Sequence, residues 1–165
     1  MATITLGGNT VHTNGELPQL GTKLIDFKLV NTDLETNTLA DFAGKKLVLN
    51  IFPSVETGTC SASVRAFNKA ASSLENTVVL CISRDLPFAQ KRFCGAEGLN
   101  NVIMLSDYKN ADFGVTYGLK LLDGAFSDLL SRVVIIADEN GVIKYTEQVS
   151  EIADEPNYES ALAAL

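Results

Sequence analysis

The segment from Lys45 to Phe52 constrains the fold more than any other part of this chain. Its sequence, KKLVLNIF, is almost continuously apolar, and such a run is typical of a strand that is covered on both faces. Pro53 ends the strand, a loop follows at residues 54–58, and apolar side chains after Cys60 recur at intervals of three and four. That spacing predicts an amphipathic helix. A buried strand followed so closely by a helix indicates an α/β fold.

The remaining pattern adds strands and helices to this unit. Two short β-prone runs on either side of Gly7 and Gly8 predict a β-hairpin within residues 1–14. A βαβ unit followed by an antiparallel hairpin and a closing helix indicates a mixed central sheet with helices on both faces. Further strands are predicted at residues 27–30, 35–39, 77–83, 102–105, 131–138 and 142–149, and helices at 86–95 and 158–165, while the pattern at 112–119 is ambiguous.

The charge balance excludes some classes of partner. The 165 residues carry a formal net charge of −7, and an acidic surface argues against binding to nucleic acid or to an anionic membrane. No apolar run approaches the ~20 residues that a spanning helix needs. Residues 1–8 lack the positive and apolar segments of a secretory signal. We therefore expect a cytoplasmic protein, with the periplasm as the alternative if a leader has been removed.

The chain has three cysteines, Cys60, Cys81 and Cys94. An odd number without a secretory signal argues against a framework of structural disulfides. The remaining roles are a catalytic thiol, a metal ligand or a small buried residue. A metal site is the weakest of these, because there is no C-x-x-C pair and the only histidine is His12. Cys81 lies within the apolar strand TVVLCIS, which favours a buried residue without chemistry.

Cys60 lies where a loop becomes a helix. A cysteine in the first helical turn meets unsatisfied backbone N–H groups and the positive end of the helix dipole, and both favour the nucleophilic thiolate. The hydroxyl of Thr57, three residues earlier, can turn back to hydrogen-bond the sulfur or an oxygen atom of a substrate. The alternative is that Thr57 or Thr59 only caps the helix and that Cys60 is a core residue. Position alone leaves both interpretations open.

A reactive thiolate also needs donors to the negative charge that develops during its reaction. Arg132 opens a predicted buried strand, where an unpaired charge is costly. Its anionic partner is either a thiolate or an ordinary structural carboxylate. Arg65 lies further along the predicted helix, and Arg84, at a strand end, fits a surface residue better. Arg132 is therefore the preferred cation.

These residues resemble the peroxiredoxins. Pro53, Thr57 and Cys60 match the family motif Pro-x-x-x-Thr-x-x-Cys. The segments FPSVETGTCSASVRAFN and LPFAQKRFCGAEG, with the strand SRVVI and the N-terminal hairpin, are similar to the bacterial thiol peroxidase branch over essentially the whole chain. Small departures are Glu56, where the branch usually has Asp, and Thr59, where Val is common. The resemblance implies a single thioredoxin-like domain over residues 1–165, with residues 1–14 as its hairpin.

The resemblance also implies a role for each site residue. Cys60 would be the peroxidatic cysteine, Thr57 and Arg132 its activators, and Pro53 the residue that shields the sulfur and shapes the loop. Cys94 would be the resolving cysteine, forming an intramolecular Cys60–Cys94 disulfide that thioredoxin reduces. The implied enzyme is an antioxidant peroxidase that reduces hydrogen peroxide and, preferentially, organic hydroperoxides. Family members are typically homodimers without a metal or organic cofactor.

The implied disulfide would require movement. Cys60 begins one predicted helix and Cys94 lies near the end of the next, whereas a disulfide needs Cα atoms within ~7 Å. We therefore expect both segments to unwind locally when the two sulfurs lie further apart in the reduced protein. Gly58, Gly95 and Gly98 favour such a rearrangement, since glycine adopts many backbone conformations.

Three other functions compete with peroxide reduction. A dithiol oxidoreductase would need C-x-x-C, but Ser63 stands three residues after Cys60. A redox relay would use the same residues and pass its oxidation to a partner protein, and an interaction module would have inert cysteines. Four apolar residues are candidates for a substrate groove, although a core position is at least as good an interpretation of each: Phe52, Phe93, Tyr117 and Leu119.

Overall fold

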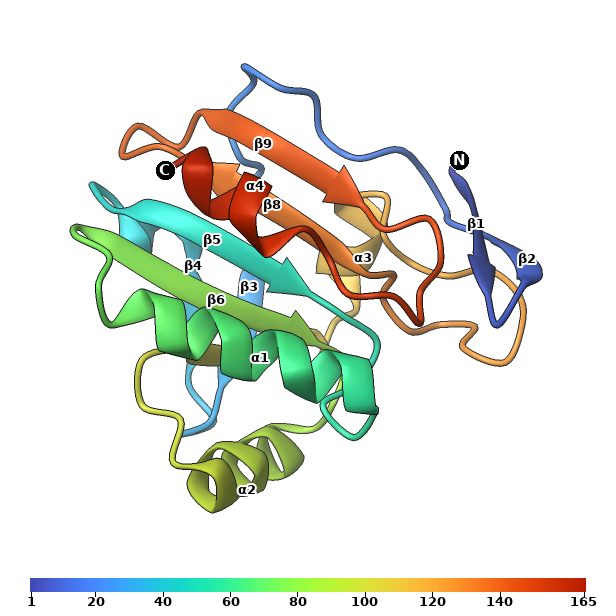
Figure 1. Ribbon diagram of the computed structural model, residues 1–165, viewed down its shortest axis with the longest axis horizontal. Coiled ribbons are helices and arrows are strands. Elements are labelled where there is room, and N and C mark those ends of the chain that lie inside the picture. The colour runs from blue at the N-terminus through green and yellow to red at the C-terminus, as the bar shows by residue number, and fades with distance from the viewer.

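The computed structural model describes residues 1–165 and is built around a seven-stranded mixed sheet (Figure 1). Its strands are β3 (Lys28–Asn31), β4 (Thr36–Thr38), β5 (Lys46–Ile51), β6 (Thr77–Ser83), β7 (Ile103–Ser106), β8 (Val133–Ala137) and β9 (Ile143–Gln148). They lie in the order β4-β3-β7-β6-β5-β8-β9. The three central strands β5, β6 and β7 are parallel, and the other neighbours are antiparallel.

Helices cover both faces of this sheet, as the sequence predicted. The helices are α1 (Gly58–Ala71), α2 (Pro87–Glu97), α3 (Asp112–Thr116) and α4 (Tyr158–Ala163), with one 3-10 turn at Leu39–Phe42. Figure 1 shows α1 and α4 in front of the sheet and α3 behind it. Side chains of α1, α2 and α4 share one core cluster, and those of α3 belong to the cluster on the opposite face. None of the helices has both the length and the apolar character needed to cross a bilayer.

Strand β5 shows why its sequence is so uniformly apolar. Leu47, Leu49 and Ile51 point into the core under α3, whereas Val48 and the following Phe52 point into the core under α1. All five side chains are almost completely buried. Burying each of these side chains contributes about 1.5–3 kcal/mol to folding, so this strand fixes the position of the loop that leaves its carboxyl end.

The N-terminal hairpin is confirmed as β1 (Thr3–Leu6) and β2 (Asn9–His12). Its turn residues Gly7 and Gly8 both have positive φ, at 58° and 80°. This is the backbone of a two-residue hairpin turn, which side chains other than glycine disfavour.

The hairpin is bound to the segment that follows β9. The Glu151 carboxylate accepts hydrogen bonds from the Thr5 hydroxyl at 2.8 Å and from the N–H groups of Gly7 and Gly8 at 2.9 and 3.0 Å. A hydrogen bond from the Ala153 N–H, together with these three bonds, lowers the pKa of Glu151 to about 2. The ionised carboxylate therefore holds the hairpin beside the C-terminal segment throughout the physiological pH range.

One predicted boundary was wrong in a way that matters for the site. Helix α2 continues to Glu97 and does not end at Gly95. Its C-cap is Gly98, which has a left-handed backbone with φ 66° and donates its N–H to the Cys94 carbonyl. Since a glycine in this conformation ends a helix efficiently, Cys94 lies inside the last full turn of α2.

Candidate active site

The loop between β5 and α1 delivers Cys60 into the first turn of α1. Thr57 has an extended backbone at the N-cap position, and its carbonyl accepts the Ser61 N–H at 3.0 Å. Cys60 is therefore the third residue of the helix, and it is 0% exposed. Cys60 therefore lies near the unsatisfied N–H groups of the first turn and near the positive end of the helix dipole.

Arg132 lies directly against this sulfur. Its Nη2 donates to Cys60 Sγ at 3.3 Å and its Nε donates to the Ile152 carbonyl at 2.7 Å. Arg132 is only 2% exposed, yet none of the ion pairs in the structure includes it. Of the two partners that the sequence allowed for this arginine, the structure provides the sulfur and no carboxylate. Arg132 Nη1 is buried without a hydrogen-bond partner, so one charged donor is free to bind an incoming oxygen atom.

The other two arginines considered from the sequence are engaged elsewhere. Arg65 makes a two-pronged ion pair with Glu97 of α2, through Nε at 2.8 Å and Nη2 at 2.9 Å. Arg84 donates to the Asp128 carbonyl at 2.7 Å. Arg132 is therefore the guanidinium that contacts the Cys60 sulfur.

Thr57 and Pro53 lie in the loop that precedes Cys60. The Thr57 hydroxyl donates to the Ser54 carbonyl at 3.2 Å and makes no side-chain cap bond with the helix. In this structure the hydroxyl therefore donates its hydrogen bond to the loop backbone and not to the Cys60 sulfur. Pro53 is buried at the point where the chain leaves the sheet, where its fixed φ restricts the path of the loop.

A small cavity of about 130 Å³ opens beside the first turn of α1. Its polar wall consists of Thr57, the next two residues and Arg132, and its apolar wall comes from distant segments. The cavity is lined by Leu6, Thr57, Gly58, Thr59, Phe126, Arg132, Ile152 and Ala153.

The apolar wall was not foreseen from the sequence. The proposed groove residues Phe52, Phe93, Tyr117 and Leu119 do not line this cavity and belong to the core. The residues that do line it, Leu6, Phe126 and Ile152, lie in the hairpin and in two loops. No local pattern marks them, because only the tertiary structure brings these segments together.

Cys94 lies on α2 and is partly exposed. It is a free thiol, like Cys60 and Cys81, so the structure shows the reduced protein. Burial raises the pKa of the Cys94 thiol, and it lies near the C-terminal end of its helix, where the dipole disfavours an anion. While α2 is folded, Cys94 is therefore held as the protonated, weakly nucleophilic thiol.

Cys81 is buried, as the sequence suggested. It is 0% exposed in β6, and burial raises its pKa to about 12. Asn50 Nδ2 donates to the Cys81 sulfur at 3.7 Å. No group of three or more His, Cys, Asp or Glu side chains is arranged to hold a metal ion.

Comparison with known proteins identifies the family. The sequence model of the Redoxin family matches residues 19–162. This chain belongs to the redoxin family. It is 55% identical over 165 residues to the thiol peroxidase of Corynebacterium glutamicum, and the match covers 100% of this chain and 99% of that protein. This redoxin is accordingly a member of the thiol peroxidase branch and an oxidoreductase.

Solved structures confirm the fold of this redoxin. A peroxiredoxin-like protein from Aquifex aeolicus superposes with a TM-score of 0.92 at 32% identity, covering 99% of this chain and 95% of that one. Thiol peroxidase from Chromobacterium violaceum gives a TM-score of 0.91 at 22% identity, covering 98% and 93% of the two chains. The thioredoxin-like peroxiredoxin fold expected from the sequence is therefore correct.

Proposed function

We propose that this redoxin is a thioredoxin-dependent peroxidase in which Cys60 is the sulfur that attacks the peroxide. One observation carries the assignment of the sulfur. The buried guanidinium of Arg132 contacts Cys60 Sγ at 3.3 Å and has no carboxylate partner. A buried cation without an acidic partner is costly unless an anion is nearby, and the Cys60 thiolate supplies that anion.

In the first step, the Cys60 thiolate attacks one peroxide oxygen. A sulfur–oxygen bond forms and the O–O bond breaks, so that the cysteine becomes a sulfenic acid and the leaving alkoxide or hydroxide takes up a proton. Negative charge builds up on the departing oxygen. Arg132 Nη1 and the free backbone N–H groups of the first α1 turn are the donors available to stabilise it.

The walls of the cavity favour an organic hydroperoxide. A substrate in this cavity would meet Thr57 and Arg132 at its polar end and Leu6, Phe126 and Ile152 at its apolar end. An alkyl or aryl group placed on the apolar side gains free energy by leaving water. Hydrogen peroxide would use the polar end alone and should be reduced less efficiently.

Cys94 would resolve the sulfenic acid. Its thiolate attacks Cys60 Sγ, the hydroxyl leaves as water after taking up a proton, and an intramolecular disulfide forms. Thioredoxin would then reduce this disulfide by thiol–disulfide exchange. Both cysteines lie in regular helices and are unbonded in this structure, and we expect the first turn of α1 and the end of α2 to open in this step.

A peptide map tests these assignments. The protein is treated with one equivalent of cumene hydroperoxide, alkylated and digested without reductant, and the linked peptides are identified by mass spectrometry. We expect a Cys60–Cys94 peptide and a free Cys81 thiol. Cys81→Ser is the matched control and should give the same linked peptide. A link through Cys81, or a link between two chains, would contradict Cys94 as the resolving residue.

We also propose three properties of the whole protein. A reducing compartment such as the cytosol suits three unpaired cysteines.

A homodimer is supported by the exposed apolar side chains Leu86 and Phe88 at the start of α2, which are 52% and 67% exposed. A single folding unit over residues 1–165 is supported by the bonds between the hairpin and Glu151. Light scattering and the coincidence of unfolding transitions test the last two.

A further inference from the structure

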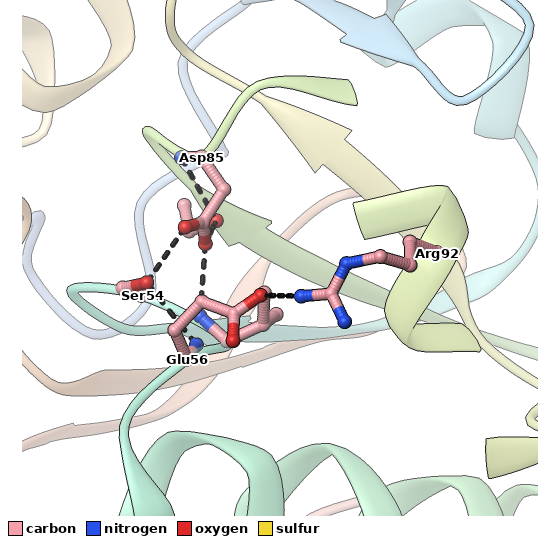
Figure 2. Close-up of polar contacts among 6 residues, drawn as sticks. Ser54, Glu56, Asp85 and Arg92 are labelled. Carbon is pink, nitrogen blue, oxygen red and sulfur yellow. Dashed lines mark hydrogen bonds and ion pairs between the residues drawn. The ribbon is translucent and has the colours of Figure 1, made fainter. Parts of the chain in front are cut away.

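The loop that carries Thr57 is held by a carboxylate from a neighbouring strand. Asp85 follows β6, and its Oδ1 accepts the Ser54 hydroxyl at 2.6 Å while its Oδ2 accepts the Val55 N–H at 2.9 Å. Figure 2 shows the Asp85 carboxylate pointing at the loop from the end of the strand. This contact follows from the parallel pairing of β5 and β6, in which Ile51 lies opposite Ile82. Ser54 and Asp85, three residues after Ile51 and Ile82, meet just beyond the ends of these strands.

The bonds to Asp85 determine where the Thr57 hydroxyl lies. The Ser54 carbonyl accepts both the Thr57 N–H and the Thr57 hydroxyl, each at 3.2 Å. The Ser54 hydroxyl, while it donates to Asp85, also accepts the Glu56 N–H at 3.1 Å. Ser54 is thus the centre of the turn, and the carboxylate fixes Ser54.

The carboxylate is itself firmly anchored. The Ser83 hydroxyl donates to Asp85 Oδ2 at 2.6 Å and accepts from Gln90 Nε2 at 3.1 Å. Gln90 is completely buried and belongs to α2. The Ser106 hydroxyl of β7 donates to the Asp85 carbonyl. Asp85 is therefore fixed by the sheet and by the helix that carries Cys94.

We propose that Asp85 is a positioning residue for the reaction of Cys60 with peroxide. It acts through Ser54 and Val55 to place Thr57 and the first turn of α1 at the correct distance from a bound hydroperoxide. The proposal rests on the proposed peroxidase function. A displacement of about 1 Å in a reacting group can lower a rate by about a hundredfold. The thiolate itself depends on Arg132, which Asp85 does not contact.

The test is Asp85→Asn, with Glu56→Gln as a matched control. Both substitutions exchange a carboxylate for an amide of the same shape and remove one negative charge. Glu56 lies in the same loop, but its carboxylate only pairs with Arg92 at the surface (Figure 2). Each full-length variant is mixed with cumene hydroperoxide and, separately, with iodoacetamide, and the loss of the Cys60 thiol is followed. Alkylation needs the thiolate alone, whereas peroxide reduction also needs the oriented donors.

We expect Asp85→Asn to slow the reaction with hydroperoxide by about ten- to a hundredfold and to leave alkylation unchanged. Glu56→Gln should behave as the wild type in both reactions. Ser54→Ala keeps the carboxylate and its bond to the Val55 N–H, and it removes the two hydrogen bonds of the Ser54 hydroxyl, to Asp85 and from the Glu56 N–H. It should show a smaller loss of the same kind, and it replaces Asp85→Asn in the test if that variant does not fold.

Either of two results would overturn the role of Asp85: equal hydroperoxide rates in Asp85→Asn and the wild type, or an equal loss in both reactions. A wild-type protein that is alkylated readily but does not react with hydroperoxide would instead contradict the proposed function.

Discussion

The two cysteines assigned to catalysis lie at opposite ends of neighbouring helices and in opposite environments. Cys60 lies in the first turn of α1, completely buried, with a guanidinium 3.3 Å from its sulfur. Cys94 lies in the last turn of α2, partly exposed, and burial raises its pKa. The first site places a guanidinium donor against the sulfur that we propose as the nucleophile. The second holds a thiol that becomes a good nucleophile only when its helix opens.

In the proposed mechanism, this difference gives the two steps a fixed order. A Cys94 that was already ionised would react with oxidants by itself and would compete with the intended nucleophile. Because the folded α2 keeps Cys94 protonated, the energy of opening the helix becomes part of the resolving step. The same arrangement implies that changes near Cys60 affect peroxide reduction, whereas changes near Cys94 affect only recycling.

The largest effect should come from removing the cation. Arg132→Gln keeps a side chain with donors but loses the charge that faces Cys60. We expect the rate of reaction with hydroperoxide to fall by about a hundred- to a thousandfold, as when one oxyanion donor is lost. Stopped-flow measurement of Cys60 oxidation checks this. Arg65→Gln is the control, because Arg65 pairs with Glu97 instead of the sulfur, and it should retain nearly the full rate.

Removing the resolving thiol should separate the two steps. Cys94→Ser should oxidise at Cys60 as fast as the wild type, since Cys94 is not in contact with Arg132 or the cavity. Its turnover with thioredoxin should be lost, and excess hydroperoxide should convert Cys60 to sulfinic acid. Mass spectrometry of the treated variant measures this product. Unchanged turnover with thioredoxin would show that the comparison between the two cysteines is wrong.

The resolving step should accelerate as the pH rises. Folding raises the pKa of Cys94 above its ordinary value of 9.0. The folded helix therefore binds this proton more tightly than the open one. The stability that this proton gives to the folded end of α2 is present in full below about pH 9. It is lost as the pH rises through the pKa that Cys94 has in the folded helix. Rapid acid quench after one equivalent of hydroperoxide, from about pH 7 to about pH 9.5, measures disulfide formation. A rate that is constant over this range would contradict a protonated Cys94.

The smallest effect should come from the ion pair that joins the two helices. Glu97→Gln removes the two-pronged bond from Arg65 of α1 to the end of α2. Both side chains are partly exposed, and exposed pairs contribute little. We expect the disulfide to form faster by at most about fivefold, with no change in the first oxidation. Glu75→Gln, an exposed acid outside every ion pair, is the control for loss of charge.

Much of the fold could be predicted from local pattern. Strand β6 was predicted with the observed bounds, and the hairpin, β5 and β8 were predicted within one or two residues. The end of α2 was misplaced because Gly95 and Gly98 are both possible stops, and only the backbone angle at Gly98 distinguishes them. The short α3 remained ambiguous because five residues are too few to show a helical period.

The residues of the candidate site also fall into those that the sequence could predict and those that it could not. Cys60, Thr57 and Pro53 form one continuous segment, so their spacing could be recognised directly. Arg132 was selected from its place at the start of a predicted buried strand, and the family resemblance then implied the same residue. The role of Cys94 came from the resemblance alone, and membership of the family is confirmed for the chain as a whole. The anchoring by Asp85 and the apolar wall formed by Leu6, Phe126 and Ile152 could not be predicted, because each involves segments that are far apart in the sequence.

The sequence by itself determined most of the strands and helices, and that a cysteine begins a helix after a buried strand. These properties depend on side chains a few residues apart. Only the tertiary structure decided which charges reach that cysteine. Antiparallel pairing of β5 with β8 places Val133 opposite Ile51, which brings Arg132 to the sulfur across 72 positions of sequence. Parallel pairing with β6 brings Asp85 to the loop. Sheet register is set by how whole faces pack, so no local stretch of sequence contains it.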